Sequence, residues 1–229
     1  IETLRARLEG NGLSLVACSN GVDAIWTDRP SPPNAPAWAH PPNLCGETAE
    51  DKLRHLGASI AAQAAQTAVI TLPDSLCWLL NLRGRDVPRT PIAQCFGLLN
   101  ADGTLTLFGD EMKFADLTLP ETVTLAPWDA FPGQLKDLAG TVLIEPASLP
   151  QAAFDALSAG SAKILRGLDP CSLPKACKTS RELEGCRAAH LRDGAAVVQF
   201  LAWFDSADPS ELSEIDIVKQ LESYRAATN

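Results

Sequence analysis

The sequence predicts an α/β fold with a mixed sheet, and three observations support this prediction. Between residues 47 and 168, short apolar runs typical of strands alternate with longer segments of helical period. Such alternation is typical of helices packed on a sheet. The dipeptide Asp102-Gly103 joins two apolar runs and indicates a hairpin, so at least one strand pair is antiparallel. After Asp169-Pro170 the pattern changes to helices alone.

The N-terminal segment predicts three short elements. Residues 1–12 have the period of a helix, with Leu4 and Leu8 four positions apart and glycine at the end. The β-prone run LSLVAC at 13–18 predicts a short strand, and residues 20–28 predict a short helix.

A proline-rich stretch follows, RPSPPNAPAWAHPP at 29–42. Proline fixes φ and removes a backbone donor, so this stretch is unsuited to a helix or a central strand. It predicts a linker, in which Trp38 packs onto the surface of a neighbouring domain.

The main α/β segment opens with a capped helix. Thr48 is the predicted N-cap of a helix of about 17 residues, with Asp51 in the capping-box position. The next elements are predicted from hydrophobic period and flanking turn residues. In chain order they are a strand at 68–72, a helix at 73–80, a hairpin of strands at 92–100 and 104–109, a strand at 123–127, a helix at 128–139, a strand at 141–146, a helix at 151–159 and a strand at 162–167.

Two amphipathic helices end the chain. Thr179 and Glu182 form a capping-box pattern for a helix that runs to about residue 204, and a further helix is predicted at 213–225. Two such helices cannot form a core alone, so their apolar stripes need a covering surface. We expect a second copy of the chain to supply it, in a two-fold homodimer. The stripes comprise Leu183, Val197, Leu201 and Phe204 on the first helix, and Ile217, Leu221 and Tyr224 on the second.

Charge and hydropathy exclude several classes of function. The 229 residues include 28 acidic and 19 basic side chains, a net charge of −9. Nucleic acids and anionic membrane surfaces attract basic patches, so the composition argues against both as partners. No apolar run reaches about 18 residues, so no transmembrane helix is predicted. The sequence begins at Ile1, inside a helical pattern and without a signal segment, which predicts excision from a longer protein.

The cysteines and histidines do not have the spacing of a metal site. Cys171, Cys177 and Cys186 lie nearest to one another among seven cysteines, and His190 follows as a fourth candidate ligand. We interpret the thiols as reduced and mostly buried, which predicts a cytoplasmic protein. His190 lies on an apolar stripe, so a core position is favoured over a metal or proton-transfer role. Motifs of serine nucleophiles and of nucleotide loops are absent from the sequence.

The most distinctive stretch is DSLCWLLNLRGRDVP at 74–88. It resembles the segment of three-domain Xaa-Pro aminopeptidases (aminopeptidase P, creatinase family) that reads Asp-x-Ile-Ala-Trp-Leu-x-Asn-Leu-Arg-Gly-x-Asp-Val. Other stretches are similar to the same family and extend the resemblance over nearly the whole chain. They are VDAIWTDRPSPP at 22–33, GETAEDKLRHL at 46–56, the passage from LPKACKTS to FLAWF at 173–204, and ELSEIDIVKQLESYR at 211–225.

The resemblance implies a domain order. Residues 1–42 are expected to be the end of a first α/β domain plus the linker. Residues 43–172 are expected to be a second, creatinase N-terminal-like (ribonuclease H-like) domain with a mixed sheet. Residues 173–229 are expected to be the opening helices of a pita-bread catalytic domain. In the family that third domain holds two metal ions, often manganese, on two Asp, one His and two Glu, and it cleaves X-Pro peptides.

For this segment the resemblance implies neither catalytic residues nor bound metal, because the ligand motifs of the family are not found in it. A rival interpretation is a non-catalytic, peptidase-like binding module similar to a histone-chaperone domain. The candidate substrate-cleft residues are Arg83 and Asp86, in a loop that borders the cleft in the family. The alternative for them is a pairing with each other that fixes the loop. Arg85, the run Arg89-Thr90-Pro91 and the run Gln94-Cys95-Phe96 depart from the residues usual in the family.

Overall fold

The computed structural model describes residues 2–16 and 18–228. These residues form two compact units. The first combines Ile1–Pro42 with Glu47–Cys177, and the second combines Asn43–Gly46 with Lys178–Asn229. The sheet and the helices that pack on it belong to the first unit, and the two long C-terminal helices belong to the second.

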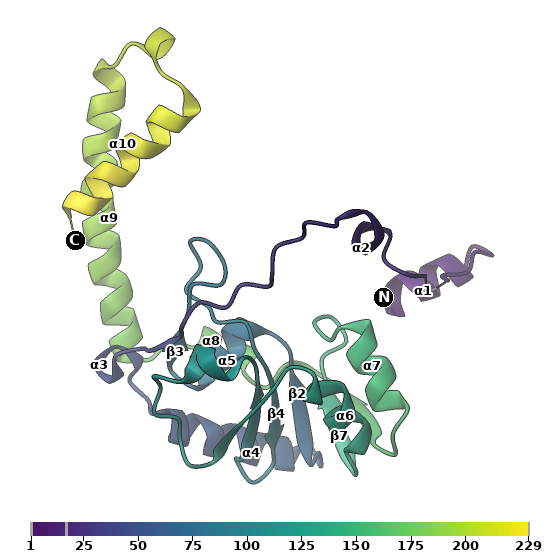
Figure 1. Ribbon diagram of the computed structural model, residues 1–229. Helices are drawn as coiled ribbons and strands as arrows, with labels where there is room; N and C mark the ends of the chain where they lie inside the picture. The colour runs from purple at the N-terminus through teal and green to yellow at the C-terminus, as the bar shows by residue number, and fades with distance from the viewer. Residues whose placement is uncertain (1, 17, 229) are drawn as a thin grey trace. The chain divides into compact units, whose positions relative to one another are not determined.

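A mixed six-stranded sheet forms the centre of the first unit (Figure 1), in the order β6-β5-β4-β2-β7-β8. The strands β2, β7 and β8 run parallel, β4 is antiparallel to both β2 and β5, and β6 is parallel to β5. The predicted mixed α/β fold is therefore confirmed. The strands are β2 Thr67–Ile70, β4 Phe96–Asn100, β5 Leu105–Phe108, β6 Val123–Ala126, β7 Thr141–Ile144 and β8 Lys163–Arg166.

Helices cover both faces of this sheet. Successive side chains of a strand point to opposite faces. Ile70 accordingly packs with Leu53 and Leu76 of α4 and α5, whereas Val69 packs with Phe131 and Leu157 of α6 and α7. The result is a three-layer arrangement with one apolar core on each side of the sheet. Between residues 47 and 177 the helices of this unit are α4 Ala49–Ala62, α5 Pro73–Leu79, α6 Ala130–Asp137, α7 Gln151–Ser158 and α8 Ser172–Ala176.

The predicted hairpin is confirmed, with a shorter first strand. Asn100 donates its backbone N–H to the carbonyl of Thr104 at 2.9 Å, and Gly103 has φ +86° in the turn between β4 and β5. Only glycine adopts such a φ at no steric cost. The first strand begins at Phe96, so the expected strand was wrong for residues 92–95. That segment instead hydrogen-bonds to the loop that precedes it.

The N-terminal segment forms α1 Glu2–Glu9 and α2 Gly21–Ile25, both as predicted. The strand expected at 13–18 was wrong, because the described residues of that run are exposed coil. A strand needs a neighbour for its hydrogen bonds, and among the strands that the structure describes none pairs with this run. The linker does have a neighbour: β1 Trp38–Ala39 pairs antiparallel with β3 Leu82–Arg83. The short helix α3 Pro42–Cys45 follows it.

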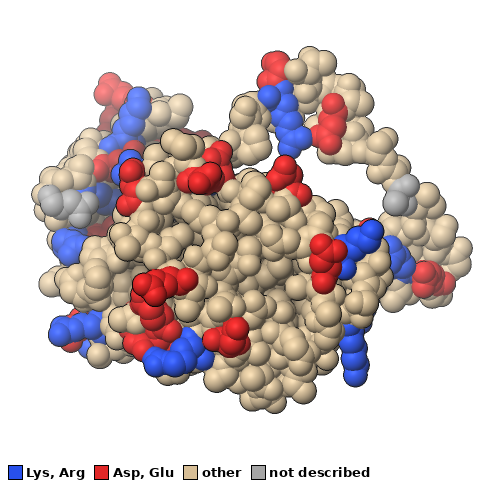
Figure 2. All heavy atoms as spheres, turned by 60° about the horizontal axis from the view of Figure 1, so that its bottom comes forward, with Lys and Arg blue, Asp and Glu red and all other residues tan. Residues whose placement is uncertain are grey.

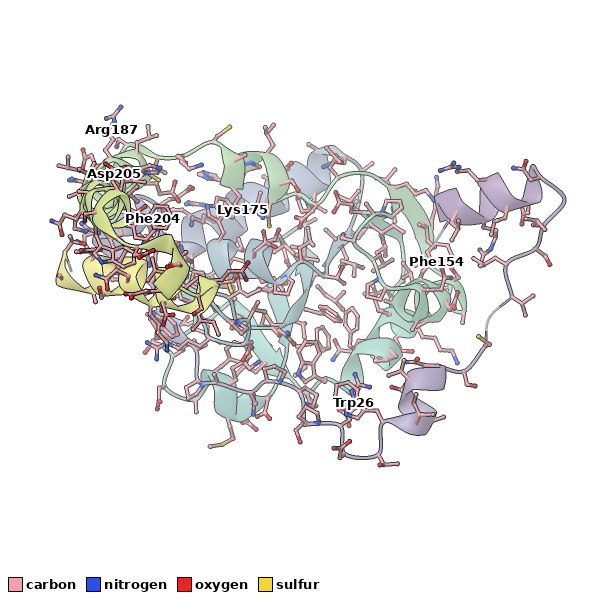
Figure 3. The ribbon with its side chains drawn as sticks, turned by 90° about the horizontal axis from the view of Figure 1, so that it is seen from above. Trp26, Phe154, Lys175, Arg187, Phe204 and Asp205 are labelled. Atoms are coloured by element: carbon pink, nitrogen blue, oxygen red, sulfur yellow. The ribbon has the colours of Figure 1, made fainter. Side chains whose placement is uncertain are left out.

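The second unit contains α9 Ser180–Ser206, the short 3-10 turn η2 Pro209–Glu211, and α10 Glu214–Ala227. Both long helices begin with a complete capping box, at Thr179 and at Ser213, which confirms both predicted helix starts. They pack on each other and half-bury the apolar stripe of α10. Phe204 of α9 (Figure 3) is 40% exposed and Leu201 is 55% exposed. Each helix thus covers only part of the other.

Charged side chains are dispersed over the surface. On the face shown in Figure 2, acidic and basic groups are interspersed among uncharged residues. Over the whole sequence acidic residues outnumber basic ones by 28 to 19. Among residues 2–16 and 18–228, no helix has both the length and the apolar character that crossing a bilayer requires.

Candidate functional site

The loop after α5 begins at a helix end fixed by a buried lysine. Asn81 ends the helix with φ +51°, a conformation that asparagine tolerates better than most residues. Lys52 of α4 is 2% exposed, and its ammonium donates to Asn81 Oδ1 at 2.7 Å and to the Trp78 carbonyl at 2.8 Å. It also lies 4.3 Å from the centroid of the Trp78 ring. The Asn81 amide donates to the Glu47 carbonyl at 2.8 Å. Lys52 therefore determines where the chain leaves α5.

Arg83 is half-buried at the start of the loop. Its Nη1 donates to its neighbouring carbonyl, that of Leu82, at 2.8 Å, and to the Cys77 carbonyl at 3.4 Å. Carbonyls near the end of a helix lack intrahelical partners, so a guanidinium beside them is favourable. In this position Arg83 stabilises the junction between α5 and the loop.

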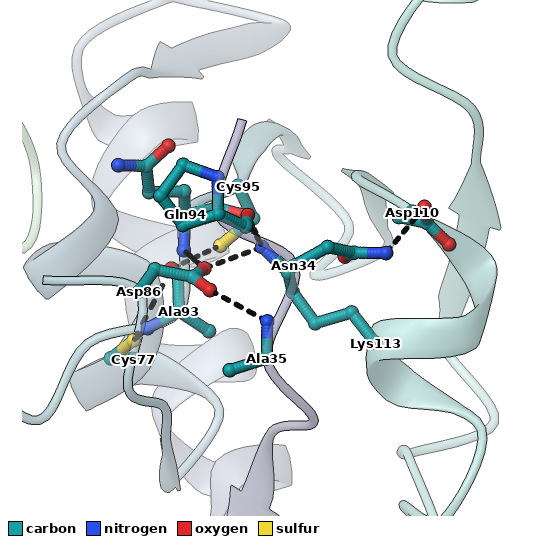
Figure 4. Close-up of polar contacts among 10 residues, drawn as sticks. Asn34, Ala35, Cys77, Asp86, Ala93, Gln94, Cys95, Asp110 and Lys113 are labelled. Atoms are coloured by element: carbon teal, nitrogen blue, oxygen red, sulfur yellow. Dashed lines mark hydrogen bonds and ion pairs between the residues drawn. The ribbon is translucent and has the colours of Figure 1, made fainter. Parts of the chain in front are cut away.

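Asp86 holds three segments together (Figure 4). Its carboxylate accepts the backbone N–H of Ala35 at 3.1 Å and that of Gln94 at 2.6 Å, and it forms an ion pair with Lys113. Lys113 also donates to the carbonyls of Gln94 at 3.3 Å and Pro33 at 3.4 Å. A buried charge is tolerated only when it is paired and hydrogen-bonded, and both conditions hold for this pair.

The linker makes further bonds near the same pair. Asn34 donates its side-chain amide to the Asp110 carboxylate at 2.6 Å, and Ala37 donates its N–H to the Lys113 carbonyl at 2.8 Å. Asp110 caps η1, the 3-10 turn Glu111–Phe114 that carries Lys113. Linker, loop and turn therefore form one hydrogen-bonded assembly, with Asp86 at its centre.

Two buried thiols lie under the loop. Ala93 donates its N–H to Cys77 Sγ at 3.3 Å, and Cys95 Sγ donates to the Ala93 carbonyl at 3.4 Å. Burial raises the pKa of both thiols, so they stay neutral at physiological pH. They act here as small apolar side chains that also satisfy the backbone of Ala93.

Gly84 allows two backbone segments to meet. A Cβ at this position would lie 2.7 Å from the Ala93 Cα and 2.7 Å from the Ile92 carbonyl oxygen. Backbone atoms cannot move aside as the tip of a side chain can. Gly84 is therefore needed for the close contact between the loop and residues 91–93.

We expect Gly84→Ala to destabilise the first unit by about 1–3 kcal/mol, the cost of overpacking a tight contact. Urea unfolding monitored by circular dichroism measures this loss. The matched control is Gly133→Ala in α6, where a Cβ meets no atom within 4 Å. That substitution should be neutral or stabilise by up to about 1 kcal/mol, because alanine favours a helix over glycine. Equal effects of the two substitutions would contradict the prediction.

The exposed part of the loop borders a shallow pocket of about 410 Å³, lined by Trp38 and by residues 84, 85 and 87–91. A tight turn shapes its rim: Thr90 donates its N–H to the Val87 carbonyl at 3.2 Å, and Arg89 has φ +64°. The Arg85 guanidinium lies 5.4 Å from the centroid of the Trp38 ring, on the linker strand β1. The network described above thus presents a small cationic and aromatic surface to solvent.

Comparison with known proteins matches residues 28–182 to the family model described as Creatinase/Prolidase N-terminal domain. This match covers more than half of the chain. The chain belongs to the creatinase/prolidase N-terminal domain family. The Trp78–Asp86 stretch, the Lys52 network and the pocket all lie inside the matched residues.

Relatives of the family extend the similarity over nearly the whole chain. A protein of Aspergillus niger named Probable Xaa-Pro aminopeptidase P is 31% identical over 98% of this chain, and one of Leptosphaeria maculans with the same name is 32% identical over 90%. The X-prolyl aminopeptidase of Caenorhabditis elegans, a cytosolic enzyme with a di-nuclear active site, superposes with a TM-score of 0.83 at 26% identity over 98% of this chain. The chain spans 36–39% of the length of these three proteins.

A more distant structure shares the fold. The Xaa-Pro dipeptidase of Bacillus anthracis superposes with a TM-score of 0.60 at 17% identity, over 80% of this chain. The creatinase/prolidase N-terminal fold therefore persists where little sequence similarity remains.

Each residue singled out in the sequence now has a place in this family fold. Arg83 and Asp86 lie in one loop, but Asp86 pairs with Lys113 and Arg83 bonds to carbonyls, so they do not fix the loop by pairing with each other. The core position expected for His190 was wrong: the side chain is exposed, with Nδ1 2.8 Å from the Cys186 carbonyl oxygen. None of the seven cysteines forms a disulfide among the residues that the structure describes.

The described residues do not fit a two-metal centre. Among residues 2–16 and 18–228, no three or more His, Cys, Asp or Glu side chains are grouped so that they could hold a metal ion. Two carboxylates near the loop already have partners within the protein. Asp86 forms an ion pair with Lys113, and Asp110 caps η1. No step of catalysis is assigned to these side chains.

Sequence reasoning missed the structural roles of the two buried lysines. Lys52 belongs to the Gly-x-Thr-x-x-x-Lys pattern of residues 46–52, and that pattern was a usable signal for it. Lys113 has no local signal, because its partner Asp86 lies 27 positions away in the sequence. Both are buried lysines, which are rare unless paired, and each positions the loop from a different side.

Proposed function

We propose that this chain is the non-catalytic part of a metal-dependent Xaa-Pro aminopeptidase, an enzyme that removes an N-terminal residue preceding proline. In this proposal the loop at 83–91 shapes one wall of the cleft that admits the peptide. The observation that carries it is the Asp86 network, which fixes the loop and the linker into one assembly and leaves their outer surface open. The relatives named Xaa-Pro aminopeptidase P support the substrate class.

The metal centre of the proposed enzyme is assigned to residues outside 1–229. The C. elegans relative has a di-nuclear active site, and we propose two divalent ions, manganese by preference, for the protein to which this chain belongs. Two such ions supply a nucleophile at neutral pH and stabilise the developing oxyanion. In this proposal Arg83 and Asp86 contribute the position of the cleft wall.

The chain by itself is expected to hydrolyse no X-Pro peptide, with or without Mn²⁺, whereas the longer protein releases the first residue of Arg-Pro-Pro in a metal-dependent reaction. The assay follows free arginine by chromatography. The control is a preparation from host cells that do not express the protein, purified in the same way. Metal-dependent release by residues 1–229 would refute the non-catalytic role. An inactive longer protein would instead favour the peptidase-like binding module.

The domain organisation is also part of the proposal. We assign residues 1–42 to the end of a first domain plus linker, 43–172 to the second domain, and 173–229 to the opening helices of the catalytic domain. Support comes from the compact unit that ends near Cys177 and from the change to helices alone after it. We also propose a cytoplasmic location, which is supported by cysteines that form no disulfide among the described residues and by the cytosolic C. elegans relative.

A homodimer through α9 and α10 is the proposed assembly. Exposed apolar side chains of these helices, among them Leu191 at 78% and Val198 at 66%, favour burial against a second copy. Analytical ultracentrifugation should show a dimer that dissociates in the variant Leu191→Glu/Val198→Glu. The control Leu168→Glu changes a leucine of the first unit that is 73% exposed, and it should leave the dimer intact. A wild-type monomer at micromolar concentration would contradict the prediction.

A further inference from the structure

The pocket beside the loop contains a cation without a carboxylate partner. Among the residues that the structure describes, no acidic side chain forms an ion pair with Arg85, although acidic residues outnumber basic ones by 28 to 19 in the sequence. Its guanidinium is held over the Trp38 ring instead, at 5.4 Å from the centroid. This contact leaves the N–H groups of the guanidinium available. An arginine held in this way is suited to bind a carboxylate.

Both walls of the pocket are fixed before any ligand binds. Arg85 lies between Gly84, which is packed against Ala93, and Asp86, which is locked by Lys113. Trp38 is paired in register with Arg83 between β1 and β3. A backbone that is already fixed loses little conformational entropy on binding, so even a single ionic contact here contributes to affinity.

The shape of the pocket indicates an acidic side chain within a peptide. A site for a chain terminus usually closes around the carboxylate with backbone N–H groups. This rim is open, and Pro88, Thr90 and Pro91 on it are exposed, so a chain can enter and continue beyond the pocket. The indole of Trp38 and the proline rings offer apolar contact to the methylenes of a glutamate. The carboxylate then lies against Arg85.

We propose that the Trp38–Arg85 pocket binds a glutamate or aspartate side chain of the peptide. The proposal rests on the function proposed above for its peptide ligand. This preference would make acidic peptides the favoured substrates of the longer protein.

The test measures peptide binding to the 229-residue chain, without hydrolysis, by following the Trp38 indole N–H in two-dimensional NMR. The probes are two amidated peptides, Ala-Pro-Ala-Glu-Ala and Ala-Pro-Ala-Gln-Ala, and the glutamine peptide with a free C-terminal carboxylate. We expect the glutamate peptide to bind about tenfold more tightly than its amidated glutamine counterpart, as for a hydrogen bond to a charged group. The variant Arg85→Gln should abolish this difference. The control is Arg166→Gln, which removes another exposed arginine whose guanidinium lies 5.7 Å from the centroid of the Phe154 ring. This variant should keep the preference for the glutamate peptide.

Three outcomes would overturn the proposal. The first is equal affinity for the glutamate and the amidated glutamine peptides. The second is a preference for glutamate that Arg85→Gln does not reduce. The third is tight binding of the glutamine peptide only when its C-terminus is free. The last would assign the pocket to a chain terminus. An otherwise unchanged spectrum of Arg85→Gln shows that the variant folds. The titration is independent of catalysis, so it tests the pocket separately from the proposed function. The pocket could show no preference for glutamate although the longer protein cleaves X-Pro peptides. Conversely, the pocket could prefer glutamate although the longer protein is inactive.

Discussion

Replacing Lys113 by methionine is expected to destabilise the first unit by about 3–5 kcal/mol, the cost of leaving a buried charge without its partner. The side chains of Lys113 and Asp86 are 1% and 0% exposed, so water cannot replace the lost ammonium. The carboxylate would keep the N–H groups of Ala35 and Gln94 but no counter-charge. Urea unfolding at pH 7 measures the loss.

Two further variants separate the ion pair from its surroundings. Lys175→Met removes a surface pair with Asp74, whose side chains are 27% and 51% exposed, and should cost less than about 1 kcal/mol. The double variant Lys113→Met/Asp86→Asn removes both charges and should recover part of the loss, because no buried charge remains. A loss from Lys113→Met as small as that from Lys175→Met would show that the Asp86 carboxylate finds another partner.

The elements predicted well are those whose signals are local. Thr48 caps α4 through the Asp51 N–H at 3.1 Å, and the Asp102-Gly103 turn joins two antiparallel strands. In both cases the residues that define the element lie within four positions of one another. Successive residues of a strand then point to opposite faces of the sheet, so Val69 and Ile70 pack into the two different apolar cores. Local chemistry and hydrophobic period were therefore sufficient for the sheet and its helices.

The features that sequence reasoning missed depend on contacts between distant segments. The strand expected at 13–18 had the right composition but no neighbouring strand, and composition carries no information on neighbours. The linker gained a strand because Trp38 meets Arg83, 45 positions further on. His190 follows a helical stripe that the structure leaves exposed. In each case tertiary packing, and not local propensity, decided the outcome.

The candidate site also combines features that follow from local sequence with features that depend on contacts between distant segments. Arg83 and Asp86, which the resemblance suggested for a substrate cleft, flank residues of the pocket, and their role at a cleft stays a prediction. The sequence offered no means of assigning Asp86 to the interior and Arg85 to the surface, because that choice depends on Lys113 and on the linker folding back. The polar residues of the distinctive stretch mainly position the loop. Among the residues that depart from the family pattern, Arg85 and residues 89–91 are exposed, whereas Cys95 is buried.

Lys52→Met is expected to destabilise the same unit by about 3 kcal/mol, because two buried acceptors lose their donor. The acceptors are the Trp78 carbonyl, near the end of α5, and the Asn81 side chain. Methionine fills the volume of the lysine stem, so the loss reflects the ammonium and not a cavity. Thermal and urea unfolding measure it, with Lys136→Met at an exposed position of α6 as a control of less than about 0.5 kcal/mol.

Asn81 variants distinguish the hydrogen bonds from the backbone geometry. Asn81→Gly removes the bonds to Lys52 and Glu47 but accepts φ +51° freely, whereas Asn81→Ala adds about 1 kcal/mol of left-handed strain. If Lys52 positions the loop, Lys52→Met should also weaken glutamate-peptide binding at Arg85, which it does not touch. If Lys52→Met is destabilised but binds the peptide with unchanged affinity, then Asp86 and the linker hold the pocket without help from α4. The loop would then be positioned by the Asp86 network alone.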